Sequence, residues 1–435
     1  MARAAQTNLT NRAHGSPGGL ATDPAIPSRD LLLDPDRVAE QLSRLAHGTP
    51  AIESCSLRRV KYRIGESLRV VYNVVAGGNA FVMSARTFTN SATAFRQAAT
   101  MATPVGVMPG VAHDPHTNTV WWTVPNDRKL NNLGTLLDAP SRVRQASGVA
   151  WERSTLVEYT PERSATARVL DAEGLVAGYA KAYLDRDALD VANQYDTVAA
   201  SLASINGVRT PRALGWARLD RIIVLEPMLG VPWNKLPGHN QTAAMRHFGS
   251  ALAHVHELPT DFGRGPFQRY RLERVLNSAD LVSIARPDVA AVARRLSDKL
   301  AGGPPTPTSI VCVHGDVQAN NVLFHGDQVH MIDFDQGGSG TASADLGSVL
   351  ASLMTIRLIN PDGVVAGLGA ALLDGYGSVR ALPSTAELVW YTSAACVADG
   401  AIRAVNRVYQ PTLAVLAELL ELAGATLTGK ATIDG

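Results

Sequence analysis

The sequence HGDVQANN occupies residues 314–321, and the tripeptide DFD follows at residues 333–335. An apolar run, SIVCV, precedes the first motif at residues 309–313, and two further runs, NVLF at 321–324 and VHMI at 329–332, lead to the second. Short apolar runs bounded by turn residues are typical of β-strands. The first motif is therefore predicted to form a loop between two strands, and the second to follow a β-hairpin.

The polar residues of these motifs suit the transfer of a phosphoryl group. Asp316 and Asn321 lie on the predicted loop, and Asp333 follows the predicted hairpin. Phosphoryl transfer needs a carboxylate beside the acceptor hydroxyl and oxygen ligands for Mg²⁺. One Asp and one Asn suffice when phosphates and water complete the shell, because Mg²⁺ prefers hard oxygen ligands. The alternative is a loop whose Asp and Asn only form turns, and the joint spacing favours the chemistry.

The composition narrows the class of protein. The 435 residues include 40 basic and 39 acidic side chains, so the charge gives no reason to expect nucleic acid or a membrane as a partner. Cys55, Cys312 and Cys396 lack the spacing of a zinc site or a disulfide framework, which is typical of a reducing compartment. With no apolar signal-peptide centre and no run of membrane-spanning length, the chain is expected to be cytoplasmic.

The region before residue 236 contains two similar series of predicted elements. The first has strands within 57–75 and 80–88, a helix at 91–101 and a strand at 119–124; the second has strands at 155–159, 164–170 and 175–184, a helix at 187–205 and a strand at 221–226. Tyr62 matches Tyr159 at an offset of 97 residues, and Pro109 matches Pro211 at an offset of 102. These offsets predict an internal duplication, the alternative being two unrelated α+β segments.

Basic residues alternate along the first series. We call Arg58, Arg59, Lys61, Arg63 and Arg69 the basic cluster. Side chains alternate between the two faces of a strand. We therefore expect the basic cluster to form a solvent-exposed sheet face.

The motifs closely resemble those of the aminoglycoside phosphotransferase/choline kinase family, which is related to the protein kinases. The resemblance covers residues 151–427 and is most specific for residues 314–347. It implies an α+β, protein-kinase-like fold of two lobes, with a β-rich small lobe and a helical large lobe. In this chain a degenerate copy of the small lobe is expected to precede them.

The resemblance also implies how the chain is divided. Residues 1–29, rich in Ala, Gly, Pro, Thr and Asn, are predicted to be a disordered tail. Residues 30–148 would form the additional α+β domain, and 149–236 the nucleotide-binding small lobe. Residues 237–435 would form the helical catalytic lobe.

Roles for the motif residues follow from the resemblance. Asp316 would be the catalytic base or the residue that orients the acceptor hydroxyl. Asn321 and Asp333 would bind the metal ion, and Asp335 would assist at the metal site. Asp345, in the sequence DLGS, would cap a helix or brace the catalytic loop.

Roles in nucleotide binding follow in the same way. Lys181 would contact the α- and β-phosphates as a point charge, and the turn at residues 160–164 would cover them. Asp196 would pair with this lysine, although the family more often has Glu there and Asp187 and Asp190 compete for the role.

The hinge between the lobes is expected just after the second series. The strand that ends at Glu226, with Met228 close behind it, would present backbone groups to the nucleobase. The resemblance therefore implies ATP, or GTP, and Mg²⁺ as cofactors.

The implied function is that of a small-molecule kinase, a phosphotransferase with an alcohol group as acceptor. The acceptor would be a hydroxyl of a sugar, an aminoglycoside or a related metabolite; acidic residues are sparse after Asp345, which favours a neutral molecule. A pseudokinase that serves binding or regulation is the alternative. A protein kinase is disfavoured, because HGD replaces the usual HRD and no activation segment of usual length precedes Asp345.

Overall fold

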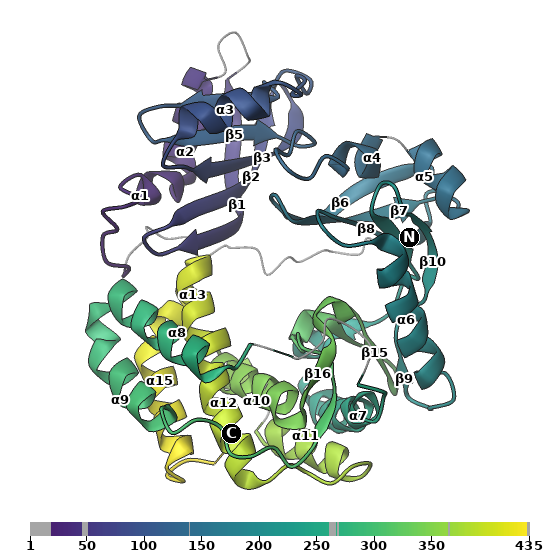
Figure 1. Ribbon diagram of the computed structural model, residues 1–435, viewed down its shortest axis with the longest axis vertical. Helices are drawn as coiled ribbons and strands as arrows, with labels where there is room; N and C mark the ends of the chain where they lie inside the picture. Colours follow the sequence, from purple (N-terminus) through teal and green to yellow (C-terminus); the bar gives the residue numbers. More distant parts are fainter. Residues whose placement is uncertain are drawn as a thin grey trace. The chain divides into compact units, whose positions relative to one another are not determined.

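The computed structural model describes residues 19–45, 51–138, 140–260, 267, 269–363 and 366–432 (Figure 1). The fold is α+β, as predicted. Contacts along the chain divide it into two units. Unit 1 comprises Met1–Arg186, Ala217–Ile222 and Ala404–Leu413, and unit 2 comprises Asp187–Trp216, Ile223–Arg403 and Ala414–Gly435.

The first sheet contains five antiparallel strands in the order β1-β2-β3-β5-β4. The strands are β1 (Ile52–Arg63), β2 (Ser67–Ala76), β3 (Asn79–Thr87), β4 (Val111–Asp114) and β5 (Thr119–Thr123), and the helices are α1 (Arg29–Leu32), α2 (Pro35–Leu45) and α3 (Ser91–Ala99). Every residue of β5 is buried. Tyr72 stacks on Trp121 with ring centroids 5.5 Å apart, so aromatic packing forms the core beneath this strand.

The second sheet has the order β10-β11-β8-β7-β6. Its strands are β6 (Arg153–Thr160), β7 (Ser164–Leu170), β8 (Val176–Tyr183), β10 (Ala213–Ala217) and β11 (Ile222–Leu225), and the helices around it are α4 (Leu133–Asp138), α5 (Pro140–Ser147) and α6 (Ala188–Leu202). Read from the other edge, the strands follow the same sequence as in the first sheet. Each sheet also has a fully buried strand beside its third strand, β5 or β11.

One local arrangement occurs at the first hairpin of both sheets. The carboxylate of a preceding Asp accepts hydrogen bonds from a Tyr hydroxyl on the first strand and from the backbone N–H at the turn. These residues are Asp23, Tyr62 and Gly65 in the first sheet, and Asp127, Tyr159 and Glu162 in the second. The two turn residues have left-handed backbones, with φ of 70° and 59°. The common origin of the sheets remains a prediction.

The described part of the predicted disordered tail is folded. Leu20 and Ile26 are buried, and Asp23 accepts a hydrogen bond from Ala25 N–H at 3.0 Å as well as those from the β1–β2 hairpin. The prediction was therefore wrong for residues 19–29. The Gly- and Pro-rich composition gave no sign of the hydrogen bonds that the Asp23 carboxylate makes. Residues 1–18 lie outside the described residues. The boundaries at residues 148 and 236 remain predictions.

The basic cluster is mostly half-buried, so the expected solvent-exposed sheet face was wrong. The side chains of Arg59 and Arg69 are 20% and 19% exposed, and only Arg63 is classed as exposed. The reason is tertiary packing. The turn between β6 and β7 contacts this face of the first sheet, as the Arg69–Glu162 ion pair at 3.0 Å shows.

Unit 2 is mostly helical and carries short strands. Its helices are α7 (Gly238–His256), α8 (Leu272–Ala285), α9 (Ala290–Leu300), α10 (Ala342–Ile359), α11 (Leu368–Gly377), α12 (Thr385–Ala395) and α15 (Leu416–Leu427). Most residues of α13 (Ile402–Arg407) and α14 (Gln410–Ala414) belong to unit 1. Strand β13 (Ile310–Val313) pairs with β16 (Gly338–Thr341), and β14 (Val322–His325) pairs with β15 (Gln328–Met331), which also adjoins β9 (Val208–Arg209); β12 (Val231–Pro232) completes the set. The strand, loop and hairpin predicted from the motifs are all present.

Helix α10 is long and apolar enough to satisfy the criteria for a membrane span, which the sequence reading did not expect. Sixty-seven per cent of this segment is buried inside the protein. It also carries Asp345, a carboxylate that is 1% exposed and hydrogen-bonded. Burial of this kind is typical of the central helix of a folded domain.

Candidate active site

The catalytic loop begins at a glycine that no other residue can replace without strain. Strand β13 ends at Val313, and Gly315 follows with φ of 78°. A Cβ atom at Gly315 would lie 2.4 Å from the backbone oxygen of Gln336. The left-handed backbone and the close approach both require glycine, and together they turn the chain so that Asp316 leaves the strand.

Asp345 supports this loop through hydrogen bonds to its backbone. Its two carboxylate oxygens accept the backbone N–H groups of His314 at 2.7 Å and Gly315 at 3.0 Å, and His256 Nε2 lies 3.2 Å away. Burial opposes the ionisation of Asp345, but the contacts of His256 and the backbone N–H of His314 lower its pKa overall. The residue at the helix N-cap is Thr341, so Asp345 supports the loop.

His314 connects the loop to the segment that carries Asp333. Its Nε2 lies 3.0 Å from the carbonyl oxygen of Ile332, and its Nδ1 lies 3.3 Å from the backbone N–H of Asp316. A carbonyl only accepts, so Nε2 carries the proton and Nδ1 accepts from Asp316. The ring also packs on Phe334 at a centroid distance of 4.4 Å. His314 is thus a structural bridge between the two motifs.

The carboxylate of Asp316 is held by cationic and amide partners. Arg269 donates to Oδ1 at 3.2 Å, Gln318 Nε2 contacts the same oxygen, and Arg403 lies 4.0 Å from it. Burial raises the pKa of Asp316, but Arg269, Arg403 and the Gln318 hydrogen bond outweigh it and lower the pKa below its ordinary value. Asp316 is therefore ionised at neutral pH.

A second carboxylate, Asp399, completes this cluster, and the sequence reading missed it. Asp399 lies 3.6 Å from Arg269 and accepts a hydrogen bond from the hydroxyl of Tyr270. It belongs to a π-helical segment, Cys396–Ala401, between α12 and α13. Single π-helical turns occur often at functional sites. Arg269 and Asp399 are 47 and 83 residues from Asp316 in the sequence, so no local motif could connect them.

Asn321 has the right amide orientation for a metal ligand. Its Nδ2 donates to the backbone oxygen of Asp316 at 2.9 Å. Its backbone oxygen accepts from Ile332 N–H at 2.9 Å, which ties the loop to the hairpin. Because the amide nitrogen is used in this way, Oδ1 is the atom that remains to bind a cation.

Asp333 and Asp335 follow the hairpin as predicted. Asp333 has φ of 67° and precedes a short 3-10 helix, Phe334–Gln336. Non-glycine residues seldom adopt this conformation, and those that do are concentrated at functional sites. No group of three or more His, Cys, Asp or Glu able to hold a metal lies within the described residues. The predicted set relies on one Asn and one Asp with phosphates, so the metal roles remain predictions.

Helix α6 supports the segment that carries Asp333 and Asp335 through residues that the sequence reading missed. Gln194 Nε2 donates to the backbone oxygen of Phe334 at 2.8 Å, and the Tyr195 hydroxyl lies 3.3 Å from Asp335 Oδ1. Asp196, predicted to pair with Lys181, is exposed and accepts the backbone N–H of Ala213 at 2.9 Å. The buried polar residues of α6 were the signal for this contact, because a buried Gln needs a partner.

Lys181 lies on β8, as predicted. The strand register places it opposite Thr166, which in turn lies opposite Glu158, so these three side chains form one row across the second sheet. The residues in a row project from the same face. Lys181 therefore shares its face with the carboxylate of Glu158.

The hinge residues lie at the end of β11 and just beyond it. The backbone N–H of Glu226 donates to Arg212 O at 2.9 Å, and its side chain lies 3.5 Å from Arg209. Met228 is half-buried, and its main chain makes no hydrogen bond with the other described residues. Backbone groups at Met228 thus have hydrogen-bonding capacity for a nucleobase, whereas Glu226 N–H is already used.

Residues 142–382, more than half of the chain, match the family model described as "Phosphotransferase enzyme family". No curated protein matches the sequence. Solved structures similar to the chain include a spectinomycin phosphotransferase with ADP and spectinomycin, which is 13% identical over 65% of this chain and 95% of that one, with a TM-score of 0.47. An amicoumacin kinase with AMP-PNP is 14% identical over 67% of this chain and 90% of that one, with a TM-score of 0.44. A macrolide 2′-phosphotransferase from Brachybacterium faecium is 16% identical over 66% of this chain and 97% of that one, with a TM-score of 0.41. The family match confirms the resemblance seen in the sequence, and the chain belongs to the phosphotransferase enzyme family.

Proposed function

We propose that the chain is a small-molecule kinase that transfers the γ-phosphoryl group of ATP, with Mg²⁺, to a hydroxyl group of a metabolite. The observation that supports this most directly is the geometry at Asp316. Its carboxylate is ionised and fixed on a braced loop, and the Asn321 amide is anchored to that same loop. An enzyme of this class depends on positioning and electrostatics more than on covalent chemistry.

Asp316 would orient the acceptor hydroxyl and take its proton. A bond forms between the acceptor oxygen and the γ-phosphorus while the bond from that phosphorus to the bridging oxygen breaks, and ADP leaves. A carboxylate with a lowered pKa is a weak base, so the proton would move to Asp316 late, once the acceptor oxygen has begun to bond to phosphorus. Arg269 holds the carboxylate in place at 3.2 Å during this step.

Asn321 and Asp333 would hold Mg²⁺, which neutralises charge on the phosphates when it is bound. Their oxygen donors fit a hard cation. Lys181 would bind the nucleotide phosphates, and the backbone at Met228 would contact the base. Asp335, fixed by the Tyr195 hydroxyl at 3.3 Å, would support the metal site.

The charges near Asp316 favour a neutral acceptor. Two carboxylates, Asp316 and Asp399, are matched by Arg269 and Arg403 at distances of 3.2 to 4.0 Å. A polycationic acceptor would need unmatched carboxylates, and it would meet two guanidinium groups here. Within the proposed range of sugars, aminoglycosides and related metabolites, a sugar or another neutral hydroxylated molecule fits best.

The first experiment is phosphoryl transfer from Mg²⁺-ATP to a pooled panel of sugars, aminocyclitols, aminoglycosides and other hydroxylated metabolites, read by mass spectrometry. Asp316→Asn should lose at least about 100-fold in turnover, because general-base catalysis contributes that much or more. Asp298→Asn, the same substitution at an exposed position on α9, should change nothing. Equal activity of Asp316→Asn and wild type would remove Asp316 from the mechanism.

A further inference from the structure

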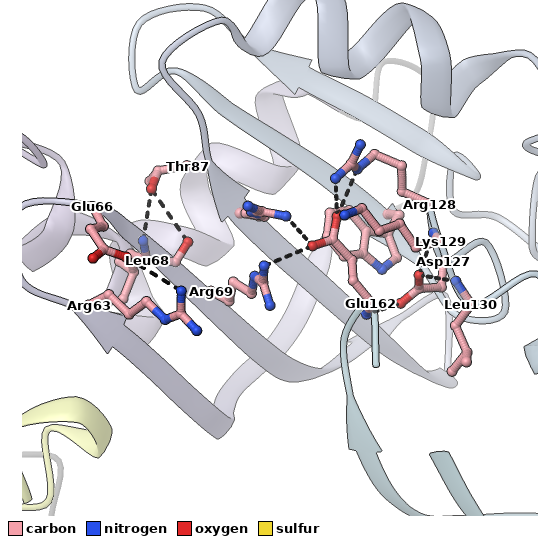
Figure 2. Close-up of polar contacts among 12 residues, drawn as sticks. Arg63, Glu66, Leu68, Arg69, Thr87, Asp127, Arg128, Lys129, Leu130 and Glu162 are labelled. Carbon is pink, nitrogen blue, oxygen red and sulfur yellow. Dashed lines mark hydrogen bonds and ion pairs between the residues drawn. The ribbon is translucent and has the colours of Figure 1, made fainter. Parts of the chain in front are cut away.

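One carboxylate of the second sheet is bound by three arginines that precede that sheet in the chain. Figure 2 shows Glu162, at the turn between β6 and β7, with Arg69 and Arg128 pointing toward it. Arg69 lies 3.0 Å from Oε2 and Arg128 lies 2.6 Å from Oε1. Arg86 also contacts Oε2, and the Glu162 side chain is only 1% exposed. We call these four residues the Glu162 cluster; it holds the side chain of the turn at both carboxylate oxygens.

The backbone of the same turn residue is held separately. Glu162 N–H donates to Asp127 Oδ2 at 2.7 Å, and the hydroxyl of Tyr159 donates to that same oxygen. The indole N–H of Trp122, on β5 of the first sheet, donates to the Tyr159 hydroxyl at 2.8 Å. Trp122 and Tyr159 are both buried. This hydrogen-bonded chain therefore connects the turn to the first sheet a second time, through the protein interior.

The backbone conformation at Glu162 is one that favours glycine. Its φ of 59° lies in the left-handed region, which costs free energy for a residue with a Cβ atom. The equivalent turn of the first sheet has Gly65 with φ of 70°, where this cost does not arise. A non-glycine residue stays in such a conformation only when its surroundings hold it there. The contacts of the Glu162 cluster supply that support, so they fix the shape of the turn.

This turn adjoins the residue proposed to bind the nucleotide phosphates. Lys181 lies opposite Thr166, and Ser164, two residues earlier on β7, closes the turn opposite Thr160. Residues two apart on a strand project from the same face and are separated by about 7 Å. A chain of phosphates bound by Lys181 is long enough to reach the turn. The shape of the turn therefore affects how these phosphates fit.

We propose that the Glu162 cluster positions the turn between β6 and β7 for nucleotide binding. The proposal rests on the proposed function, in which Lys181 binds the nucleotide phosphates. A turn that is already ordered loses less conformational entropy when a ligand binds, so the cluster raises nucleotide affinity without touching the nucleotide. Its three arginines, and Asp127, lie outside residues 142–382 that match the family model. Nucleotide affinity in this chain would thus depend on the additional domain.

The test is the affinity for Mg²⁺-ADP, measured by calorimetry on variants that circular dichroism shows to be folded. Glu162→Gln should bind Mg²⁺-ADP about tenfold more weakly than wild type, because the turn must then be ordered on binding. Glu66→Gln, the same substitution at the exposed turn of the first hairpin, should bind as wild type does. Equal affinity of folded Glu162→Gln and wild type would overturn the proposal and leave the cluster a structural role alone.

A second variant serves if Glu162→Gln does not fold. The double substitution Arg69→Gln with Arg86→Gln leaves Glu162 paired with Arg128, so its buried carboxylate keeps a cation. The affinity for Mg²⁺-ADP should still fall by at least about threefold, because a single contact holds the turn less firmly. Unchanged affinity of this folded double variant would overturn the proposal as well.

Steady-state kinetics separate positioning from a general loss of activity. With an acceptor from the panel, each variant should show a raised KM for ATP, and kcat at saturating ATP should stay within about threefold of wild type, since only binding is weakened. A lowered kcat with an unchanged KM for ATP would contradict a positioning role.

The same measurements distinguish this proposal from the proposed kinase activity. If Glu162→Gln weakens Mg²⁺-ADP binding but wild type phosphorylates no acceptor, the positioning role stands and the kinase activity fails. If wild type phosphorylates an acceptor and the variants bind Mg²⁺-ADP equally well, the kinase activity stands and the positioning role fails. No binding of Mg²⁺-ADP to wild type would overturn both.

Discussion

The two sheets share a strand order and differ in the charges of their equivalent side chains. Aligning Tyr62 with Tyr159 matches the row Lys61, Arg69 and Arg86 of the first sheet with the row Glu158, Thr166 and Lys181 of the second. The second row has one cation and one carboxylate. The first has three cations, and its Arg86, which corresponds to Lys181, contacts Glu162.

If the predicted duplication is correct, this difference shows how one of two copies can lose a role that the other keeps. In the first sheet, the cation equivalent to Lys181 contacts a carboxylate from the turn of the second sheet. The equivalent turn position in the first sheet is Gly65, which has no side chain to offer. The first sheet therefore holds the turn of the second in place, and only the second carries a lysine at the position proposed to bind a nucleotide.

The largest expected effect comes from substituting the two equivalent cations, Lys181 and Arg86. Lys181→Met should lower turnover by about 100-fold or more, because it removes the positive charge proposed to bind the α- and β-phosphates of the nucleotide. Arg86→Met should leave the affinity for Mg²⁺-ADP within a few-fold, since Arg69 and Arg128 still hold Glu162. Steady-state kinetics and ADP titration measure both. Equal losses of ADP affinity would mean that both sheets bind nucleotide.

Next in size is the loss of the buried carboxylate that joins the sheets. Glu162→Gln should lower the free energy of unfolding by about 3 kcal/mol, because it leaves three partly buried arginines without their anion. Urea unfolding measures this change. Glu173→Gln, at an exposed turn of the second sheet, should change stability by less than about 0.5 kcal/mol. Similar small effects at both positions would show that the arginines are stabilised in another way.

The catalytic loop was predictable because its residues are close in sequence. Asp316, Asn321 and Asp333 span eighteen residues, and the apolar runs around them fix the strands that carry them. The roles of Arg269 and Asp399 were not predictable, because tertiary packing alone brings them to Asp316. The positions of the loop residues thus follow from a local pattern, and the charged groups around them do not.

The predicted duplication has further sequence matches that the sequence reading did not use. LLD occurs at residues 32–34 and 136–138, and RV follows at 37–38 and 142–143. These matches lie close in the sequence to Asp23 and Asp127, which hold the two hairpins, so the predicted copies would each begin near these residues. Glu162 was not predictable as a link between the copies, because a turn residue with φ of 59° reads as a loop position.

The smallest expected effect concerns Lys61, at the end of the first row that lies away from Glu162. The pKa of Lys61 is lowered from 10.5 to about 8 by burial and by Arg63, Arg69, Arg163 and Arg59. Below pH 8, folding therefore holds this lysine charged at a cost that the unfolded chain does not bear. Between pH 8 and 10.5 the unfolded state binds more protons, so stability rises with pH over that window.

Lys61→Met removes this cost and should raise the free energy of unfolding at pH 7 by about 1 kcal/mol, after allowance for solvent screening. Its advantage over wild type should shrink as the pH rises from 8 toward 10.5, because folded wild-type Lys61 loses its proton over this range and no longer bears the cost of a buried charge. Urea unfolding of both proteins at pH 7 and 9.5 measures the difference, so that other titrating groups cancel. A destabilised variant at pH 7 would show that Lys61 is compensated inside the protein, and the contrast between a balanced row and an unbalanced one would fail.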